Sequence, residues 1–221
     1  MRSRASTGVM ARPYPRAVGF YGEQIVPRFT DIMLGNRAFG VLRRETCAGL
    51  RGDVIEIGFG SGLNVRHLPN DVAGLWAVEP SSTARRIAKK RVDESGVKFH
   101  DAGLDGQRID APDDRFDAAL STMTLCTIPD ASTALAEVRR VLKSGGEFHF
   151  CEHGHAPDPR VAKRQDRWNG VQNHLAGGCN LNRDIASLLT GAGFEIASLR
   201  NFYLKGPKAF GYMYLGRARA A

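Results

Sequence analysis

A glycine-rich segment that directly follows an apolar run constrains this chain more than any other feature. The segment reads Val54-Ile55-Glu56-Ile57-Gly58-Phe59-Gly60-Ser61-Gly62. The apolar run predicts a buried strand, and glycines at alternate positions permit positive φ and remove the Cβ atoms. A ligand can then lie against bare backbone while a following helix presents its free amide groups. The pattern therefore predicts a strand that leads into a nucleotide-binding turn.

An acidic residue about 20 positions after the glycines adds to this interpretation. Residues 74–78 read as a second buried strand, which ends at Glu79. In doubly wound folds an acid at this place accepts hydrogen bonds from the ribose hydroxyls of a nucleoside. Pro80 and Ser81 follow and introduce a helix, so an ordinary helix-capping or turn acid is the alternative interpretation of Glu79.

The order of the expected elements predicts the fold class. Strands are expected near 53–57, 75–79, 97–100, 116–121 and 146–152, and helices near 61–68, 82–95 and 131–143. This alternation predicts a parallel sheet with helices on both faces. The runs 195–203 and 210–217 are separated only by Lys205-Gly206-Pro207, which is too short for a crossover helix, so these strands must pair antiparallel. The helical segments before the first strand, interrupted at Pro27 and around Gly35, predict a cap over residues 17–50.

The positive charge of the chain is concentrated at its start. The net charge is +8, yet residues 1–51 hold nine arginines and three acids, whereas residues 52–221 hold 22 basic and 20 acidic residues. Residues 1–16 therefore predict a flexible basic tail, either a solvated arm or a contact to RNA or an anionic membrane surface. The remaining length, 17–221, suits a single α/β domain.

Cysteine spacing and hydropathy predict the compartment. Cys47, Cys126, Cys151 and Cys179 include no CxxC pair, which predicts neither a zinc site nor a disulfide framework, and no metal is expected. No apolar run approaches the roughly 20 residues of a transmembrane helix, although peripheral membrane contact stays open. A soluble, cytoplasmic protein is expected. The oligomeric state stays open.

The pattern of Glu56, Gly58, Gly60 and Gly62, ExGxGxG, resembles motif I of class I S-adenosylmethionine (SAM)-dependent methyltransferases. Further segments fall where this family has its landmarks: Phe99-His100-Asp101-Ala102, Ala111–Ala118, Ser121–Leu125 and Ala134–Phe148. These segments and the terminal hairpin extend the resemblance over about residues 17–218. The resemblance implies a Rossmann-like, seven-stranded, mostly parallel sheet with a C-terminal antiparallel hairpin, and SAM as the cofactor.

The resemblance also implies a set of cofactor contacts. They are Glu56, Gly58, Phe59, Gly60, Gly62, Glu79, Pro80, Asp101, Ala102, Ser121 and Thr122. In this family the acid at the position of Asp101 accepts a hydrogen bond from the adenine amino group. A plain turn aspartate is the alternative interpretation of Asp101.

The acceptor side carries a finer resemblance. Glu152-His153, and the segment from Gly178 to Arg183, resemble the branch that contains alkyl-thiol methyltransferase-like proteins. His153 follows the fifth strand at the carboxyl edge of the sheet and is the candidate base or acceptor-orienting group, a structural histidine being the alternative. Residues 153–180 predict a substrate lid.

Three aromatic or imidazole side chains are candidates for acceptor contact. Trp168 and His174 belong to the predicted lid, and Tyr21 belongs to the cap. The alternatives are an amphipathic helix with Trp168 as its core anchor, and a core aromatic at Tyr21.

The expected function is methyl transfer from SAM to a small acceptor: a thiol, a phenol or hydroxyl, an amine or a lipid head group. A non-catalytic SAM-binding regulatory module is one alternative. An NAD-linked oxidoreductase is another, opposed by Leu63, which stands where the NAD fingerprint needs glycine or alanine. Nucleic acid is not expected as a substrate, because Ser121-Thr122-Met123-Thr124 lacks the Asn/Asp-Pro-Pro-aromatic run of DNA-base methyltransferases.

Overall fold

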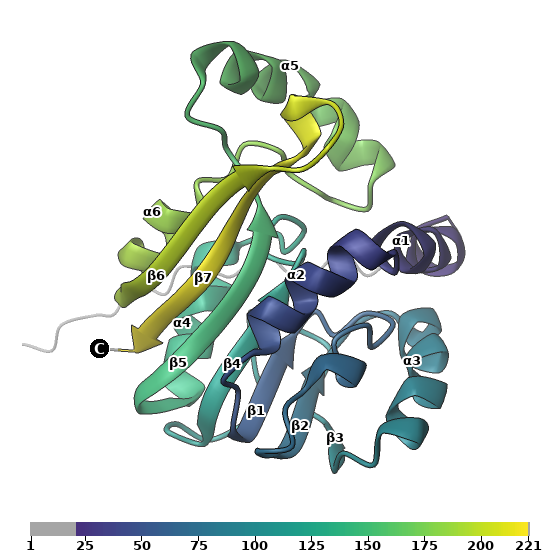
Figure 1. The fold of residues 1–221 in the computed structure, drawn as a ribbon, viewed down its shortest axis with the longest axis vertical. Helices are drawn as coiled ribbons and strands as arrows, with labels where there is room; N and C mark the ends of the chain where they lie inside the picture. Colours follow the sequence, from purple (N-terminus) through teal and green to yellow (C-terminus); the bar gives the residue numbers. More distant parts are fainter. Residues whose placement is uncertain (1–20, 221) are drawn as a thin grey trace, which may run out of the picture.

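The computed structural model describes residues 21–220, which form a seven-stranded sheet with helices on both faces (Figure 1). The strands are β1 (Gly52–Ile57), β2 (Val72–Val78), β3 (Phe99–Asp101), β4 (Phe116–Thr122), β5 (Leu142–His153), β6 (Phe194–Tyr203) and β7 (Tyr212–Ala220). Their order is β3-β2-β1-β4-β5-β7-β6. Strands β1 to β5 pair parallel, whereas β7 lies antiparallel between β5 and β6. The predicted parallel sheet and terminal hairpin are confirmed.

Side-chain alternation along the strands gives the sheet two buried faces. On one face Ile55 and Ile57 join a core with α4 (Ala131–Val141) and α6 (Ile185–Gly191). On the opposite face Val54 joins a core with α2 (Arg37–Cys47) and α3 (Ser82–Ser95). Figure 1 shows α2 crossing in front of the sheet and α4 behind it. Because both faces are covered, the central strands read as continuous apolar runs.

Strand register brings three strand ends together at the carboxyl edge of the sheet. Ile57 is paired with Val78 on β2 and with Ser121 on β4. The residues that follow these three positions therefore meet at one edge, where the order of strands reverses direction. Ligands of open α/β sheets bind at this type of edge.

The cap consists of the π-helical turn η1 (Tyr21–Ile25), α1 (Val26–Leu34) and α2. Next to the predicted interruption at Pro27, η1 ends at Ile25 and α1 begins at Val26, so Pro27 lies in the first turn of α1, where its missing N–H costs no hydrogen bond. The predicted break near Gly35 is confirmed, and Asn36 caps α2 by accepting hydrogen bonds from the N–H groups of Ala38 and Phe39. The basic tail predicted over residues 1–16 lies outside the described residues.

The helix predicted near 61–68 is wrong. The chain forms turns there and only a three-residue 3₁₀ helix, η2 (Val65–His67). Gly60 and Gly62 have φ values of 58° and 74°, which a right-handed helix cannot contain. The glycine loop therefore offers turn amides to a ligand, and no α-helix N-terminus follows it directly.

The segment after β5 projects beyond the carboxyl edge of the sheet. It contains α5 (Pro159–Leu175), which lies near the turn between β6 and β7, where the short helix η3 (Lys208–Phe210) is found (Figure 1). In the part of the chain that the structure describes, no helix combines the length and hydropathy needed to cross a bilayer.

Candidate cofactor and acceptor site

A cavity of about 270 Å³ lies at the carboxyl edge of β1, β2 and β4. Its floor is the glycine loop after β1, and its sides are the turn after β2 and the segment Thr122–Thr124 after β4. Val26, Pro27 and Thr30 of α1 line it from the cap, and residues 176–177 line it after α5. The cavity is thus enclosed between the strand ends that carry the sequence motifs and the cap that lies outside them.

The three glycines of the motif have different structural roles. A Cβ atom on Gly58 would lie 2.1 Å from Cγ2 of Thr124, and one on Gly62 would lie 3.2 Å from Cβ of Ala88. A Cβ atom on Gly60 would meet only the Gly58 carbonyl oxygen, at 3.8 Å. Gly58 and Gly62 therefore permit close packing within the protein. Gly58 and Gly60 both line the cavity, and Gly60 is the one of the two whose Cβ position is free of side-chain contacts.

Glu79 fastens the glycine loop to the turn after β2. Its side chain is buried, and its Oε2 accepts a hydrogen bond of 2.7 Å from the Gly60 N–H while Oε1 accepts one of 2.8 Å from the Ser81 N–H. Burial raises the pKa of Glu79 above its usual value, against the opposing effect of these two hydrogen bonds. The N-cap of α3 is Ser81, so Glu79 is a turn acid that also lines the cavity.

A buried polar network lies under the cavity. Arg43 Nη1 donates to Thr122 Oγ1 at 2.7 Å and to Asn64 Oδ1 at 2.8 Å, and Asn64 Nδ2 donates to Glu56 Oε1 at 2.7 Å. Burial raises the pKa of Glu56 to about 8. Arg43 Nε and Glu56 Oε2 are buried without a hydrogen-bond partner. Buried polar atoms are rarely left unpaired, and Arg43 lines the cavity, so its Nε marks a place where a polar ligand atom would be accommodated. Glu56 does not line the cavity, and its contact with the cofactor stays a prediction.

Ser121 and Thr122 face opposite sides of β4. Thr122 lines the cavity, whereas the Ser121 hydroxyl donates to Glu152 Oε1 at 2.7 Å in the interior. The carboxylate of Glu152 also accepts hydrogen bonds from the backbone N–H groups of Thr124 and Leu125. Ser121 therefore contributes to a brace that holds the loop after β4, and Thr122 is the member of the predicted pair that reaches the cavity.

Asp101 lies apart from the main cavity. Its carboxylate forms a 2.5 Å ion pair with Arg85 and accepts a 3.0 Å hydrogen bond from the Gly103 N–H. It borders a neighbouring cavity of about 280 Å³, which shares Phe59 and Glu79 with the main cavity. Asp101 thus forms a turn contact, and its contact with adenine stays a prediction.

Pro80 and Ala102 belong to the turns beside these cavities. Pro80 is exposed and lines the main cavity. Ala102 is buried, and its backbone N–H donates to the Ala77 carbonyl oxygen at 2.9 Å. The contact of Ala102 with a cofactor also stays a prediction.

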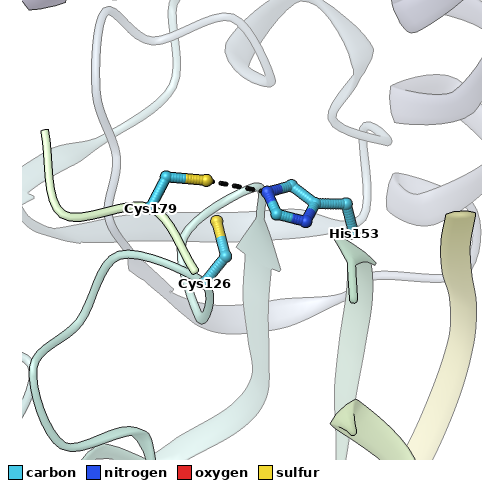
Figure 2. Close-up of side chains that lie close together, drawn as sticks. All are labelled: Cys126, His153 and Cys179. Atoms are coloured by element: carbon cyan, nitrogen blue, oxygen red, sulfur yellow. Dashed lines mark hydrogen bonds between the residues drawn. The ribbon is translucent and has the colours of Figure 1, made fainter. Parts of the chain in front are cut away.

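His153 lies behind the cavity wall at the end of β5. Its side chain is 5% exposed and is not among the residues that line the cavity. Its Nε2 lies 2.8 Å from Cys179 Sγ, and Cys126 lies beside both (Figure 2). Burial lowers the pKa of His153, but the contact with Cys179 outweighs burial and raises that pKa above its usual value. The role of His153 as a base or orienting group stays a prediction.

The other acceptor-side candidates lie at the surface. Tyr21 is 51% exposed and its hydroxyl donates to the Leu175 carbonyl oxygen at 3.1 Å, and Trp168 is 50% exposed. His174 is exposed as well, and none of the three lines the main cavity. A core position for Tyr21 or Trp168 is therefore wrong, because half of each side chain faces solvent. Acceptor contact by these three residues stays a prediction.

Sequence patterns did not reveal the contacts that hold the cap over the cavity. Asp31 on α1 forms a 2.8 Å ion pair with Arg91 on α3 and accepts a 2.6 Å hydrogen bond from the Ser61 hydroxyl. Glu23 accepts a 2.7 Å hydrogen bond from the Ser82 hydroxyl at the start of α3. Each acid is isolated in the sequence and its partners lie 30 to 60 positions away, so no local spacing signals the pairing.

Comparison with known proteins identifies the family. Residues 55–150 match the model of a family described as a methyltransferase domain. This interval contains the glycine loop, Glu79 and Thr122, which form the floor and two sides of the cavity. The family model, the relatives and the fold together support a class I SAM-dependent methyltransferase. The cofactor expected for this methyltransferase is therefore SAM.

Relatives and solved structures extend the match beyond this interval. The methyltransferase is 26% identical over 213 residues to human thiol S-methyltransferase TMT1A, which covers 87% of this chain and 80% of the human protein. It is 28% identical over 116 residues to phosphatidylethanolamine N-methyltransferase of Cereibacter sphaeroides, covering 50% of this chain and 57% of that protein.

Two solved structures have a similar fold. A SAM-dependent methyltransferase from Thermotoga maritima has a TM-score of 0.64 at 21% identity, covering 90% of this chain and 97% of that one. Geranyl diphosphate methyltransferase in complex with GPP and sinefungin has a TM-score of 0.65 at 12% identity, covering 83% of this chain and 77% of that one. At this level of identity the similarity describes the fold.

Proposed function

We propose that this methyltransferase transfers the methyl group of SAM to the sulfur atom of a small, apolar thiol. The observation that carries the proposal is that no described residue lining the cavity is a free base. Among the described residues that line it, the ionisable side chains are Glu23, Arg43 and Glu79. Glu23 and Glu79 already accept hydrogen bonds from the turn and helix start after β2, and a guanidinium cannot take up a proton.

An acceptor that needs no strong base suits such a cavity. An unperturbed thiol has a pKa of about 8.5, so roughly a tenth of it is thiolate near pH 7.5, whereas a phenol has a pKa of about 10. A thiol can therefore lose its proton to solvent before it binds. A phenol or an alcohol would require a base that the described residues of the cavity do not supply.

The residues around the cavity fit the cofactor. Gly60 leaves room for a ligand to approach the backbone, and each carboxylate oxygen of Glu79 accepts one backbone hydrogen bond and can accept another from a ribose hydroxyl. The unpaired Nε of Arg43 is a donor suited to the carboxylate of the methionine part. When bound, SAM supplies an activated methyl group on a sulfonium, so the main task of the protein is to position the two reactants.

The reaction is an in-line displacement. A lone pair of the thiolate sulfur forms a bond to the methyl carbon while the bond between that carbon and the sulfonium sulfur breaks. The products are a thioether and S-adenosylhomocysteine. Apolar side chains of the cap and floor, Val26, Leu34, Leu63 and Met123, would exclude water from the acceptor end and favour an apolar thiol over a polar one.

Similarity to human thiol S-methyltransferase TMT1A supports the choice of sulfur as the acceptor atom, because that match extends over 87% of this chain. The match to phosphatidylethanolamine N-methyltransferase covers 50% of this chain. A lipid amine is therefore the acceptor that an experiment must separate from a thiol.

A labelled-methyl panel tests the proposal. The protein is incubated with SAM labelled in its methyl group and, in parallel, with an alkyl thiol, a phenol, an alkylamine and phosphatidylethanolamine vesicles. We expect kcat/KM to be highest for the thiol and to rise with pH toward the thiol pKa. A higher kcat/KM for the phenol, the amine or the lipid would contradict the thiol assignment.

Calorimetry with SAM, S-adenosylhomocysteine and NAD separates the remaining functions. We expect both sulfur nucleosides to bind and NAD to show no heat of binding. Tight SAM binding without turnover of any acceptor would favour a regulatory module. The variant Gly60→Val should lose this binding, because its side chain would enter the cavity, and thermal unfolding of the same sample shows how much the positive φ at this position destabilises the fold.

A further inference from the structure

Three side chains from distant parts of the chain converge beside the cavity wall. Cys126 lies in the loop after β4, His153 is the last residue of β5, and Cys179 lies in the loop after α5. The two sulfur atoms and one ring nitrogen all lie within 4.8 Å of one another, and Figure 2 shows them directed toward a common point. We propose that Cys126, His153 and Cys179 bind a soft divalent metal ion such as Zn²⁺.

The donor set has the chemistry of a zinc site. Thiolate sulfur and imidazole nitrogen are the ligands that zinc prefers, and tetrahedral zinc has Zn–S distances of about 2.3 Å and Zn–N distances of about 2.0–2.1 Å. These lengths imply S···N separations of about 3.6 Å and S···S separations of about 3.8 Å. His153 Nε2 and Cys179 Sγ now lie 2.8 Å apart. Rotation of the short side chains that opens this pair by less than about 1 Å would admit the ion.

Burial strengthens the case for an ion. The exposed fractions of Cys126, His153 and Cys179 are 1%, 5% and 8%. The hydrogen bond recorded for the His153 imidazole in this cluster is its contact with Cys179 Sγ, and Cys126 Sγ lies within 4.8 Å of both atoms. A metal ion would bind all three donor atoms at once and replace these contacts with coordinate bonds.

The charges around the cluster are compatible with a divalent ion. Two thiolates would balance its two positive charges. Arg183 interacts electrostatically with both cysteines and donates hydrogen bonds to the carbonyl oxygens of Ile128 and Pro129. Its positive charge would favour an anion in the fourth coordination position, which three protein ligands leave free for water, hydroxide or another small ligand.

The cluster also explains how one wall of the cavity is held. Ala176 and Gly177 line the cavity just before Cys179, and Thr127 lines it just after Cys126. The Asn180 backbone N–H and its side-chain amide both donate to the Cys126 carbonyl oxygen at 2.9 Å. A metal ion would therefore fasten the loop after α5 to the ends of β4 and β5. This role concerns metal binding alone and does not depend on which acceptor the enzyme uses.

The sequence-based expectation of no metal site rested on spacing. The ligands come from three separate segments, so they form no short motif of the CxxC type. Only the parallel arrangement of β4 and β5, together with the return of the chain after α5, brings them together.

Metal stoichiometry tests the proposal. The reduced full-length protein is loaded with Zn²⁺, freed of excess metal by gel filtration and measured by plasma mass spectrometry. We expect about one zinc per chain, at least tenfold less in Cys126→Ser and Cys179→Ser, and an unchanged content in Cys47→Ala, a buried cysteine outside the cluster. Cobalt loading should add thiolate-to-cobalt charge-transfer absorption that both serine variants lack. Equal zinc content in the parent and both serine variants would overturn the proposal.

A measurement on the unmodified protein covers the case in which the serine variants fail to fold. After dialysis against a chelator in reducing buffer, the parent should show a lower Tm, which Zn²⁺ restores and Mg²⁺, a hard ion that prefers oxygen ligands, does not. A Tm that zinc leaves unchanged would also overturn the proposal. Failure of the methyl-transfer panel with zinc bound would refute the proposed function and leave the metal site standing.

Discussion

Replacing Glu79 by alanine is the most discriminating change, because this carboxylate has two separable roles. In the free protein its oxygens accept one backbone hydrogen bond each, from Gly60 at 2.7 Å and from Ser81 at 2.8 Å. Each oxygen has one further lone-pair direction, so the carboxylate can accept at most two more hydrogen bonds, from two ribose hydroxyls. The first pair of bonds affects the stability of the fold, and the second pair affects only the affinity for the nucleoside.

The magnitude follows from this division. Hydrogen bonds to a charged group contribute about 1.5–3 kcal/mol each, so loss of two ribose contacts should cost about 3–6 kcal/mol of binding free energy, or about 10²- to 10⁴-fold in Kd. The effect on Tm should be smaller. Loss of the backbone hydrogen bonds is offset because the variant no longer buries a carboxylate, whose raised pKa shows that burial is unfavourable for its charged form.

Calorimetric titration with S-adenosylhomocysteine measures this Kd without turnover, and thermal unfolding of the same samples measures the Tm. Glu195→Ala, an exposed acid on β6, is the matched control and should leave both values unchanged. A Kd within about threefold of the parent in Glu79→Ala, with folding intact, would show that Glu79 acts only as a turn acid.

Three further changes test the glycine loop, the cap and the buried network. Gly60→Val should raise the Kd for S-adenosylhomocysteine about tenfold or more because its side chain would enter the cavity, and its positive φ should also lower the Tm. Gly58→Ala shares the strain of a positive φ and its Cβ would also collide with Thr124, so it should lower the Tm with a smaller change in Kd; an equal change in Kd for both variants would contradict the division of roles. Asp31→Asn breaks the ion pair between the cap and α3, so it should lower the free energy of unfolding by about 1 kcal/mol and the Tm by about 2–4 °C. Asp93→Asn, which breaks an exposed ion pair within α3, is the control and should change the Tm less. The folded state keeps a proton on Glu56 up to a pKa of about 8, whereas the unfolded chain releases it near 4.5, so stability in urea should fall between these pH values in the parent and fall less in Glu56→Gln. Parallel pH profiles of the parent and Glu56→Gln would show that Glu56 does not titrate in this range.

The strands were predictable because their signal is local. Buried parallel strands are short apolar runs, and the run from Val54 to Ile57 is followed by Gly58 and ends where the structure ends β1. The antiparallel hairpin followed from the length of the connection alone, since no crossover helix fits between Tyr203 and Tyr212. In both cases the deciding information lies within about ten residues.

The helix expected after the glycine loop failed for a reason that is also local. Ser61–Leu68 has helical spacing, but that spacing says nothing about the positive φ that Gly60 and Gly62 adopt. Backbone with these positive φ angles cannot continue as a right-handed helix. The segment therefore contains only one 3₁₀ turn, η2. Glycine pairs in such loops specify backbone direction, and the hydrophobic pattern that follows them is then a poor guide to secondary structure.

The site divides in the same way into a part that sequence motifs specify and a part that they do not. Gly60, Glu79 and Thr122 follow adjacent parallel strands, so their meeting was predictable from strand order. Arg43 reaches the same cavity from the cap, and its partners are 21 and 79 residues away. A lone arginine on an amphipathic helix is normally a surface residue. Only the tertiary structure shows that this one is buried.

The cap and the floor of the cavity should differ in how easily they move when a ligand enters. The floor of the cavity rests on a sheet whose side chains are buried on both faces, and it cannot yield without disturbing the core. The cap is held partly by ion pairs and hydrogen bonds of Glu23 and Asp31, whose partly exposed positions limit each to about 1 kcal/mol. Opening the cap is therefore the less costly movement, and cofactor exchange should proceed by displacement of α1 from α3 while the strand ends stay in place. Hydrogen exchange supports this route if amides of α1 exchange faster than those of β1 and slow when S-adenosylhomocysteine binds; equal protection of α1 and β1 in the free protein would contradict it.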